Sequence, residues 1–392
     1  MTINTDQPNL LPEDEQPTRG SNPKRVLITG GAGFIGSHLA DELLAEGYTV
    51  RALDNLSPQV HGEGAGRPDY LDDRVELQVG DVRDPEAVKA ALSGVDKVIH
   101  LAAAVGVGQS MYEIRHYTET NNLATAVLLE ALIDRPVSKL LVASSMSIYG
   151  EGLYEDADGH HVGDAKRRGE DVRRGQWEPT DADGRPLTPV PTPESKCPDL
   201  SSIYALGKFD QERMCLITGE AYGIPTVALR FFNVYGTRQA LSNPYTGVLA
   251  IFASRLLNDN APLIYEDGQQ QRDFVHVTDL ARGSRLALES DDAAGRVFNL
   301  GSGEPRTVSE IGQRLAAVMG KDLEPTITGK CRLGDIRHCF ADVSLAKRVL
   351  GFEPTVDFDD GLRELTDWLA TQEADDHVEA AGAELAKRGL TV

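Results

Sequence analysis

Residues 26–39 read VLITGGAGFIGSHL, and this stretch decides the fold of the chain. Its apolar first residues predict a short strand, its glycines a turn, and residues 33–46 a helix whose apolar side faces a sheet. Gly30 permits a tight turn, Gly33 has no side chain to keep a diphosphate from the backbone, and Gly36 lets the helix lie close to the strand. A glycine turn between a strand and a helix predicts dinucleotide binding, with the diphosphate on the first helical N–H groups.

A carboxylate follows the glycines at the spacing that this kind of site requires. Asp54 ends the next apolar stretch, Thr49–Leu53, about twenty residues beyond the glycines, where an acid accepts hydrogen bonds from ribose hydroxyls. Because a carboxylate repels a 2′-phosphate, the pattern favours NAD over NADP as cofactor. The weaker interpretation of Asp54 is a solvated loop acid.

The charge of the chain narrows the range of partners. Its 392 residues carry a formal net charge of −22, which repels nucleic acid and anionic membrane surfaces. An anionic small molecule must therefore meet arginines placed inside its own site. The sequence contains no apolar run long enough for a membrane span, no basic-then-apolar start and no C-x-x-C pair among Cys197, Cys215, Cys331 and Cys339. These features predict a reduced, soluble, cytoplasmic protein.

Strand and helix patterns alternate from Lys24 onward, which predicts an α/β fold. The expected architecture is a Rossmann-type doubly wound parallel sheet, covered by helices on both faces, with a smaller C-terminal substrate-binding lobe. The expected strands are Val26–Thr29, Thr49–Leu53, Val75–Val79, Lys97–Leu101, Lys139–Ser144, Thr226–Phe231 and Val297–Leu300. The expected helices are Gly33–Glu46, Pro85–Ala91, Tyr117–Ile133, Ser202–Tyr222 and Gly247–Leu257, with one more after about Glu373.

We expect three parts along the chain. Residues 1–23 are polar and proline-bearing, which predicts a disordered leader. Residues 24–190 form the NAD-binding Rossmann domain, and residues 194–392 hold its last elements interleaved with the substrate lobe. A charged, glycine- and proline-rich insertion at about 151–193 interrupts the rhythm, and loops of this length are functional lids or disordered. Its His160-His161 pair lacks the further ligands that an ion needs, so no metal is expected.

Tyr204 and Lys208 stand four residues apart near the start of an expected helix, so their side chains share one face. An ammonium and a cationic nicotinamide both favour the phenolate of a nearby tyrosine. Tyr204 can then accept a proton from a substrate hydroxyl while the same carbon gives a hydride to NAD. The spacing alone also fits a surface pair. What favours catalysis is the Ser144-Ser145 pair that ends a central strand, where a hydroxyl can orient the reacting oxygen.

Several motifs together resemble the extended short-chain dehydrogenase/reductase family of nucleotide-sugar epimerases and dehydratases. They run in order from Gly30 to about Phe352 and include Asn121. The matching stretches are GGAGFIG at 30–36, DVRD at 81–84, HLAA at 100–103, SSMSIYG at 144–150, YALGK at 204–208, RFFNVYG at 230–236, QRDFVH at 271–276 and GDIRH at 334–338.

The resemblance implies roles for individual residues of the cofactor site and the catalytic site. Asp81 and Val82 bracket the adenine, Ala102 and Ala103 line the cofactor channel, and Asn121 supports the cofactor. Ser145 is the catalytic hydroxyl, with Ser144 as the competing choice, beside Tyr204 as base and Lys208 as the residue that lowers its pKa. The whole expected NAD site is Gly30, Gly33, Phe34, Ile35, Gly36, Asp54, Asn55, Asp81, Val82, Leu101, Ala102, Ala103, Asn121, Tyr204 and Lys208.

The resemblance also implies substrate contacts. Asn233, Arg272 and Arg337 match positions that contact the diphosphate or nucleoside of the substrate, and Ser147 is expected to bind substrate as well. Arginines at these positions suit an acidic protein that must neutralise two phosphates. The alternative is structural, with Arg272 and Arg337 paired to the neighbouring acids Asp273 and Asp335.

One departure from the family narrows the reaction. Dehydratases of the family carry an Asp-Glu pair just after the catalytic hydroxyl, whereas this chain has Met146-Ser147. Dehydration then lacks its proton donor and base. The simplest complete cycle is inversion at C4 through a transient 4-keto sugar, with no net oxidation.

Further stretches resemble the dTDP-L-rhamnose 4-epimerases, which form dTDP-6-deoxy-L-talose. They include SSMSIYGEG at 144–152, the insertion that ends near Glu194, RQALSNPYTGV at 238–248 and GDIRHCFAD at 334–342. The alternatives are a 4-epimerase of UDP-glucose/galactose or a UDP-uronate, a 4-keto-sugar reductase that prefers NADPH, and a non-catalytic NAD-sensing protein. The resemblance also implies a homodimer, for which the helices Tyr117–Ile133 and Ser202–Tyr222 are candidates.

Overall fold

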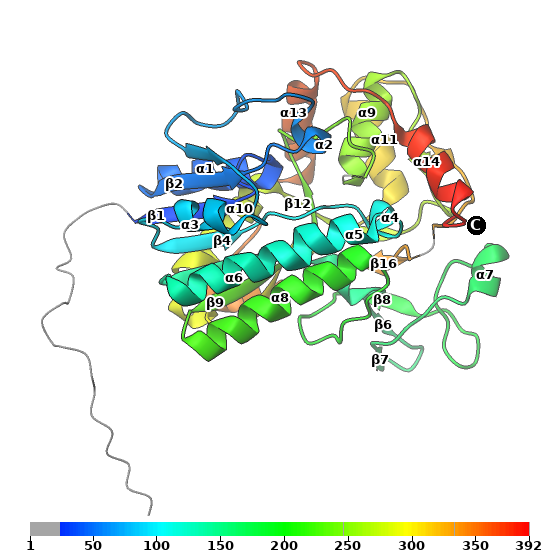
Figure 1. Ribbon diagram of the computed structural model, residues 1–392. Helices are drawn as coiled ribbons and strands as arrows, with labels where there is room; N and C mark the ends of the chain where they lie inside the picture. The colour runs from blue at the N-terminus through cyan, green and yellow to red at the C-terminus, as the bar shows by residue number, and fades with distance from the viewer. Residues whose placement is uncertain (1–23, 246, 333, 392) are drawn as a thin grey trace, which may run out of the picture.

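The fold is built on a parallel sheet of seven strands. The computed structural model describes residues 24–245, 247–332 and 334–391, so the leader predicted at 1–23 lies outside the described residues. The strands follow the order β13-β9-β5-β4-β1-β2-β3, and Figure 1 labels β9, β4, β1 and β2 among them. They are β1 (Arg25–Thr29), β2 (Thr49–Asp54), β3 (Glu76–Val79), β4 (Lys97–His100), β5 (Lys139–Ser145), β9 (Thr226–Phe231) and β13 (Val297–Leu300). All seven predicted strands are present, and the predicted fold class is confirmed.

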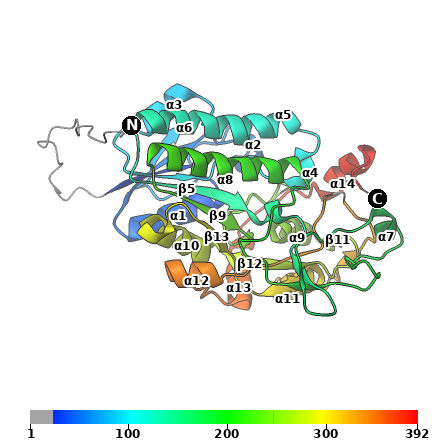
Figure 2. The same cartoon turned by 90° about the horizontal axis from the view of Figure 1, so that it is seen from below.

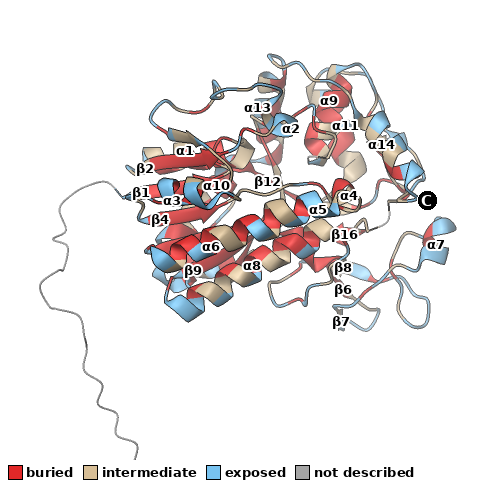
Figure 3. Cartoon of the chain, in the orientation of Figure 1, coloured by how far each residue is buried: buried red, intermediate tan, exposed pale blue. Residues whose placement is uncertain are grey.

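Helices cover the sheet on both faces. Every residue of β4, β5 and β9 is buried, which explains why these strands are apolar along most of their length instead of alternating. Figure 2 shows the two layers, and Figure 3 shows the red buried sheet between helices whose outer faces are exposed. One layer holds α1 (Phe34–Ala45), α10 (Val277–Glu289) and α12 (Ser344–Leu350), and the other holds α3 (Pro85–Ala91), α6 (Ala124–Asp134) and α8 (Ile203–Tyr222).

The strand order places a ligand site beside β1. From β1 the chain moves outward to β2 and β3, then returns to β4 on the other side of β1. The connections that follow β1 and β4 therefore run in opposite directions along the sheet. Open α/β sheets bind their ligands at the carboxyl ends of two such strands. The glycine turn, the short helix α2 (Pro58–His61) and the helix α4 (Val107–Ser110) all follow strands at this edge.

The helix predicted from Tyr117 differs from a regular α-helix. Its first turn, α5 (Ile114–Tyr117), starts three residues earlier and leads into a π-helical segment, η1 (Thr118–Leu123), before α6 begins. The wider π turn contains Asn121, which is fully buried and both donates to and accepts from the backbone of Ala104. A π turn of this kind places a side chain where an α-helical repeat would not.

A smaller lobe follows the sheet toward the C-terminus. Its hydrophobic core lies between α9 (Val248–Leu257), α11 (Val308–Val318) and α13 (Phe358–Leu369). A second sheet joins this lobe to the first, with β12 (Gln271–His276) between β10 (Asn233–Tyr235) and β14 (Pro305–Thr307) and paired also to β16 (His338–Cys339). The short strands β11 (Leu263–Ile264) and β15 (Thr326–Ile327) pair in this lobe. The turns η2 (Met146–Tyr149) and η3 (Asp291–Ala293) lie next to the central sheet.

The insertion at 151–193 folds into a small sheet of its own. The strands β7 (His161–Val162), β6 (Leu153–Glu155) and β8 (Thr188–Val190) pair in that order and carry the short helix α7 (Gly169–Arg173). Arg167 connects the insertion to the lobe, since its guanidinium reaches both Glu151 and Glu266. The described insertion is therefore ordered by a buried ion-pair network.

The last helix is α14 (Val378–Lys387), which agrees with the helix predicted after about Glu373. Figure 1 shows it in red beside the C-terminal lobe and close to α4. No helix in the described ranges is both long enough and apolar enough to cross a lipid bilayer.

Candidate active site

A single large cavity of about 670 Å³ lies between the carboxyl ends of the sheet strands and the C-terminal lobe. The glycine turn and Asp54 line one part of it, Ser145, Tyr204 and Lys208 the middle, and Arg272 a further part. Residues from all of these predicted groups therefore share one continuous space. None of the described residues of the insertion lines this cavity.

The glycine turn has the geometry of a dinucleotide site. Gly30 adopts φ +71°, a left-handed conformation that favours glycine. A Cβ on Gly36 would lie 2.3 Å from the carbonyl oxygen of Gly30, so the helix packs against its turn only because Gly36 has no side chain. At Gly33 the nearest protein atom is 3.5 Å from an ideal Cβ, which leaves its cavity side open. No side chain caps α1, so the N–H groups of its first turn are free to donate hydrogen bonds to an anion in the cavity.

Asp54 is fixed beside that turn. Its carboxylate accepts backbone N–H groups from Ala32 and Leu56, each at 3.0 Å. Further along the wall, Asp81 accepts from Asn55 at 3.3 Å and from the guanidinium of Arg83. The hydrogen bonds from Arg83 lower the pKa of Asp81 to about 2, so this carboxylate is charged at neutral pH. Two carboxylates held by hydrogen bonds thus lie at this end of the cavity.

Ser145 and Tyr204 meet in the middle of the cavity. Ser145 ends β5, and its hydroxyl oxygen accepts hydrogen bonds from the hydroxyl and the N–H of Ser147, at 2.9 and 3.2 Å. Tyr204 stands in the first turn of α8, which Ser202 caps by accepting from Ala205 N at 3.1 Å. The Tyr204 side chain lies beside Ser145, whose hydroxyl acts to lower the pKa of the phenol. The same contact favours Ser145 over Ser144, whose buried hydroxyl has no partner among the described residues.

Lys208 lies one turn further along α8 and is buried. Its ammonium donates to Gln211 Oε1 at 2.9 Å, and the Gln211 amide donates in turn to Thr125 at 2.9 Å. Burial lowers the pKa of Lys208 to about 8, because the charged form loses its hydration. Burial raises the pKa of Tyr204, and the Ser145 hydroxyl opposes that rise. Burial is thus the larger influence on the pKa of Tyr204 in this structure.

Comparison with known proteins agrees with this geometry. The model of the NAD dependent epimerase/dehydratase family matches residues 26–170 and 179–301. This chain belongs to that family. A dTDP-L-rhamnose 4-epimerase from Burkholderia thailandensis is 36% identical over 354 residues, which cover 89% of this chain and 96% of that protein.

Solved structures of the family superpose on most of the chain. UDP-glucose 4-epimerase from Thermus thermophilus, in complex with NAD, gives a TM-score of 0.70 at 32% identity and covers 88% of this chain and 99% of that one. UDP-glucuronic acid 4-epimerase from Bacillus cereus, in complex with UDP-glucuronic acid and NAD, gives 0.71 at 28% identity with the same coverage. The present family member is an NAD-dependent enzyme with a Rossmann-type fold.

The expected NAD residues of this epimerase-family enzyme lie together, with one exception. Asn121 lies behind the wall and holds the backbone of Ala104, with its Oδ1 2.7 Å from Ala104 N. It positions the channel and does not line it. The others line the cavity: Gly30, Gly33, Phe34, Ile35, Gly36, Asp54, Asn55, Asp81, Val82, Leu101, Ala102, Ala103, Tyr204 and Lys208. Bound there, NAD supplies a hydride acceptor and a cationic ring.

Three of the four expected substrate residues line the same cavity, namely Ser147, Asn233 and Arg272. Asn233 is oriented by donating to the carbonyl of Asp273 at 3.0 Å. The guanidinium of Arg272 donates to the carbonyls of Ile336 and Arg337. These contacts are with neutral acceptors, which leaves the positive charge of Arg272 available to an anion in the cavity.

Arg337 does not line the cavity, in contrast to the prediction. It is 1% exposed, and its guanidinium lies 2.5 Å from Glu178, 2.6 Å from Asp267 and 3.0 Å from Glu266. The insertion supplies Glu178, which nothing in the sequence pattern placed near Arg337. Arg337 pairs with acids, as in the structural alternative, but Asp335 is not among them, because Asp335 pairs with a different arginine.

That arginine is Arg332, which sequence reasoning missed. Its Nε lies 3.0 Å from Asp335 Oδ2, its guanidinium stacks 4.7 Å from the centre of the Tyr265 ring, and it lines the cavity. The available signal was its place two residues before Gly334-Asp335, in the same motif as Arg337. Arg272 and Arg332 therefore give the cavity two guanidinium groups.

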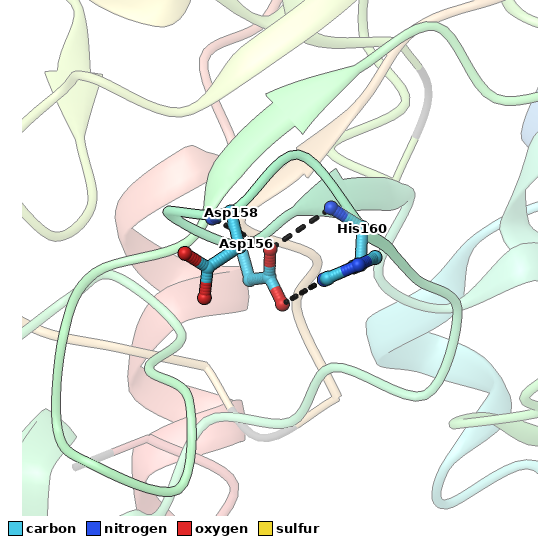
Figure 4. A group of neighbouring side chains, drawn as sticks. All are labelled: Asp156, Asp158 and His160. Atoms are coloured by element: carbon cyan, nitrogen blue, oxygen red, sulfur yellow. Dashed lines mark hydrogen bonds and ion pairs between the residues drawn. The ribbon is translucent and has the colours of Figure 1, made fainter.

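The histidine pair of the insertion has a local explanation. Asp156 accepts from the N–H groups of Asp158 and His160, both at 2.9 Å, and its other oxygen lies 3.3 Å from His160 Nδ1 (Figure 4). These contacts close the turn between β6 and β7 at the surface. His161 points elsewhere, with Nε2 3.2 Å from Glu155. The two histidines thus have different partners and do not converge.

Proposed function

We propose that the enzyme is a 4-epimerase of a nucleotide-activated hexose, acting on dTDP-L-rhamnose to form dTDP-6-deoxy-L-talose. The observation that carries the proposal is the meeting of Ser145, Tyr204 and Lys208 in one cavity with Arg272. Two guanidinium groups, Arg272 and Arg332, suit the diphosphate of a nucleotide sugar. The hydroxyl groups of Ser145 and Tyr204 suit hydrogen bonding to the oxygen on C4 of that sugar.

The residues of the chain divide the reaction into proton transfer and orientation. Tyr204 accepts the proton of the C4 hydroxyl as that carbon loses its hydride, and returns the proton when the hydride comes back to the opposite face. Ser145 hydrogen-bonds the reacting oxygen and holds it at Tyr204. Lys208 contributes positive charge that favours the phenolate and donates toward the ribose of the cofactor. The sugar turns over between the two transfers, while Arg272 and Arg332 retain the diphosphate.

Elimination of water is not part of this proposal. Met146 and Ser147 follow the catalytic Ser145, and both side chains lie in the buried turn η2. A thioether has no proton to give, and Ser147 already donates its hydroxyl to Ser145. The site thus has no acid and base pair directly after Ser145 to move a second proton.

The nucleotide and sugar are supported by likeness to the Burkholderia thailandensis enzyme, which is more similar than the superposed UDP-sugar epimerases. A 4-epimerase of UDP-glucose/galactose or of a UDP-uronate is the alternative, because it needs the same catalytic residues. A non-catalytic NAD sensor has no need of the Tyr204 and Lys208 pair.

Proton NMR of the purified enzyme with dTDP-L-rhamnose, without added reductant, tests the proposal. We expect the H4 couplings of the talo isomer to grow in until an equilibrium mixture forms. If only UDP-galactose or a UDP-uronate is inverted, the reaction is correct and the rhamnose assignment is wrong. If no nucleotide sugar reacts, the sensor alternative is favoured.

We further propose that two copies pair through α5, η1 and α8. Nine large apolar side chains are exposed in the described structure, and five of them lie on these elements: Ile114, Leu123, Leu206, Ile217 and Tyr222. Such a concentration on one pair of neighbouring helices is typical of a protein interface. The cytoplasm is the proposed compartment, which is supported by the free thiols of all four cysteines.

A further inference from the structure

The C-terminal helix α14 forms part of the wall of the catalytic cavity. Val378, Ala381, Gly382 and Leu385 stand at successive intervals of three, one and three residues and so share one helical face. All four line the cavity, and so does Leu390 just beyond the helix. The family model ends at residue 301, so this wall lies outside the part of the chain that defines the family.

The apolar face of α14 is not packed into a hydrophobic core. Leu385 is only 5% exposed, yet it belongs to none of the hydrophobic clusters formed by the described residues. It lies against α4 at Gly108, where an ideal Cβ would be 3.4 Å from the Leu385 side chain. Leu385 is therefore buried between α4 and the cavity itself.

Polar contacts at both ends hold the helix in this place. Arg255 lies 3.2 Å from Asp376 and 3.4 Å from Glu379, before and within the first turn. After the last turn, Arg388 stacks 4.2 Å from the centre of the Tyr112 ring. The strand-like pairing of Thr391 with Arg332 then joins the tail to an arginine of the cavity. Charged groups thus set the position of α14, and its apolar face is free to contact a ligand in the cavity.

We propose that Leu385 lies against the sugar of the substrate and selects a 6-deoxyhexose, an inference that rests on the proposed function. The helix α4 links Leu385 to the catalytic tyrosine, since Ser110 on α4 accepts from Tyr204 N at 3.1 Å. Between Tyr204 and the arginines Arg272 and Arg332, the space belongs to the sugar. Leu385 lines the same cavity, and the proposal places it beside that sugar.

The selection follows from burial of polar groups. A sugar hydroxyl pressed against Leu385 loses its water and gains no hydrogen bond in exchange, which is unfavourable. A methyl group at the same place gains from leaving water. An apolar wall therefore favours C6 as a methyl group over C6 as a hydroxymethyl or carboxylate group.

The test compares Leu385→Asn with Ala386→Asn, because Ala386 is the next residue of the same helix and is exposed. We expect Leu385→Asn to raise the KM for dTDP-L-rhamnose about tenfold or more, and to leave the inhibition constant of dTDP, which has no sugar, unchanged. Ala386→Asn is expected to change neither. An equal shift for dTDP places Leu385 at the nucleotide and overturns the inference.

A second variant guards against loss of the helix. Gly382 has room for a side chain, since its ideal Cβ lies 3.6 Å from the Tyr265 hydroxyl oxygen, and replacing glycine inside a helix favours the helix. Gly382→Phe therefore keeps α14 in place and fills the cavity, so the KM for dTDP-L-rhamnose rises while bound NAD per chain is unchanged. No rise in KM in either variant contradicts the inference. No turnover by the unaltered enzyme contradicts the proposed function, and the inference with it.

Discussion

At the scale of single residues, Tyr204 is in a chemical environment that opposes its own ionisation. Burial raises its pKa, and the Ser145 hydroxyl only partly offsets this. The nearby Lys208 has a pKa lowered to about 8 by burial. We therefore expect the cationic ring of bound NAD to favour the phenolate of Tyr204, which would tie the base to the presence of the hydride acceptor.

Replacing Tyr204 by phenylalanine removes the base and little else. We expect turnover to fall by at least about a hundredfold, the lower range for general acid–base catalysis. Bound NAD, measured by absorbance after denaturation, is expected to stay at the level of the unaltered enzyme. A variant that retains most of its turnover would remove Tyr204 from the mechanism.

The pH dependence of turnover follows from Lys208. Its ammonium form predominates below about pH 8 and is lost as the pH rises through that value. Since the phenolate of Tyr204 needs this positive charge, kcat is expected to decline above about pH 8. Lys208→Arg keeps its charge in this range, so its alkaline decline is expected at higher pH. A decline at the same pH in both forms would assign it to another group.

The two predicted arginines have different roles, and their substitution separates them. Arg272 faces the cavity, so Arg272→Ala is expected to raise the KM for the nucleotide sugar at least about tenfold, as loss of a charged hydrogen bond does. Arg337 is buried among Glu178, Glu266 and Asp267. Arg337→Ala leaves Asp267 without its cation, while Arg167 still pairs with Glu266, and is expected to cost about 3 kcal/mol of unfolding free energy. Chemical denaturation of both variants measures the loss of stability, and substrate titration of both measures the change in KM.

At the scale of elements, the turn from β1 into α1 contains two glycines with separable purposes. Gly36 serves packing, because a Cβ there would lie 2.3 Å from the Gly30 carbonyl oxygen. Gly33 has space on the protein side and serves the ligand. The π turn η1 serves packing in the same sense as Gly36, since it brings the buried Asn121 to the backbone that follows β4.

Alanine at each glycine tests the distinction. We expect Gly36→Ala to lower the melting temperature of the NAD-free protein, because α1 must move away from its turn. Gly33→Ala is expected to leave that melting temperature unchanged and to weaken NAD binding, since the new methyl group faces the diphosphate. Calorimetric unfolding and NAD titration distinguish the two, and similar effects of both substitutions would contradict this division.

At the scale of the whole molecule, the charge and the apolar surface are unevenly distributed. The net charge of −22 coexists with two guanidinium groups in the cavity and with exposed apolar side chains on α5, η1 and α8. In the proposed enzyme the two guanidinium groups bind a diphosphate, and the exposed apolar side chains contact a partner copy.

The dimer prediction concerns the outer side of α5, η1 and α8. Ile217 on α8 is 56% exposed, and Val79 at the edge strand β3 is 63% exposed. We expect Ile217→Glu to yield a monomer by light scattering, because a charge inside an apolar interface is unfavourable when desolvated. Val79→Glu is the matched control and is expected to leave the mass unchanged. A monomeric unaltered enzyme would contradict the proposal.

The sequence by itself determined the seven strands, their parallel fold and the grouping of the glycine turn, Asp54, Ser145, Tyr204 and Lys208. The strands and the glycine turn depend on local periodicity and on turn chemistry, which short stretches of chain carry. The roles of Ser145, Tyr204 and Lys208 as one set came from the resemblance to the family. Only the tertiary structure decided the positions of Arg332 and Arg337, the ordered fold of the insertion and the place of α14. Each of these depends on which distant segment lies opposite: Glu178 lies 159 residues from Arg337, and the neighbours of α14 are α4, Tyr265 and the cavity. Contacts between distant segments leave no periodic pattern in the chain, so they emerge only when the elements are packed together.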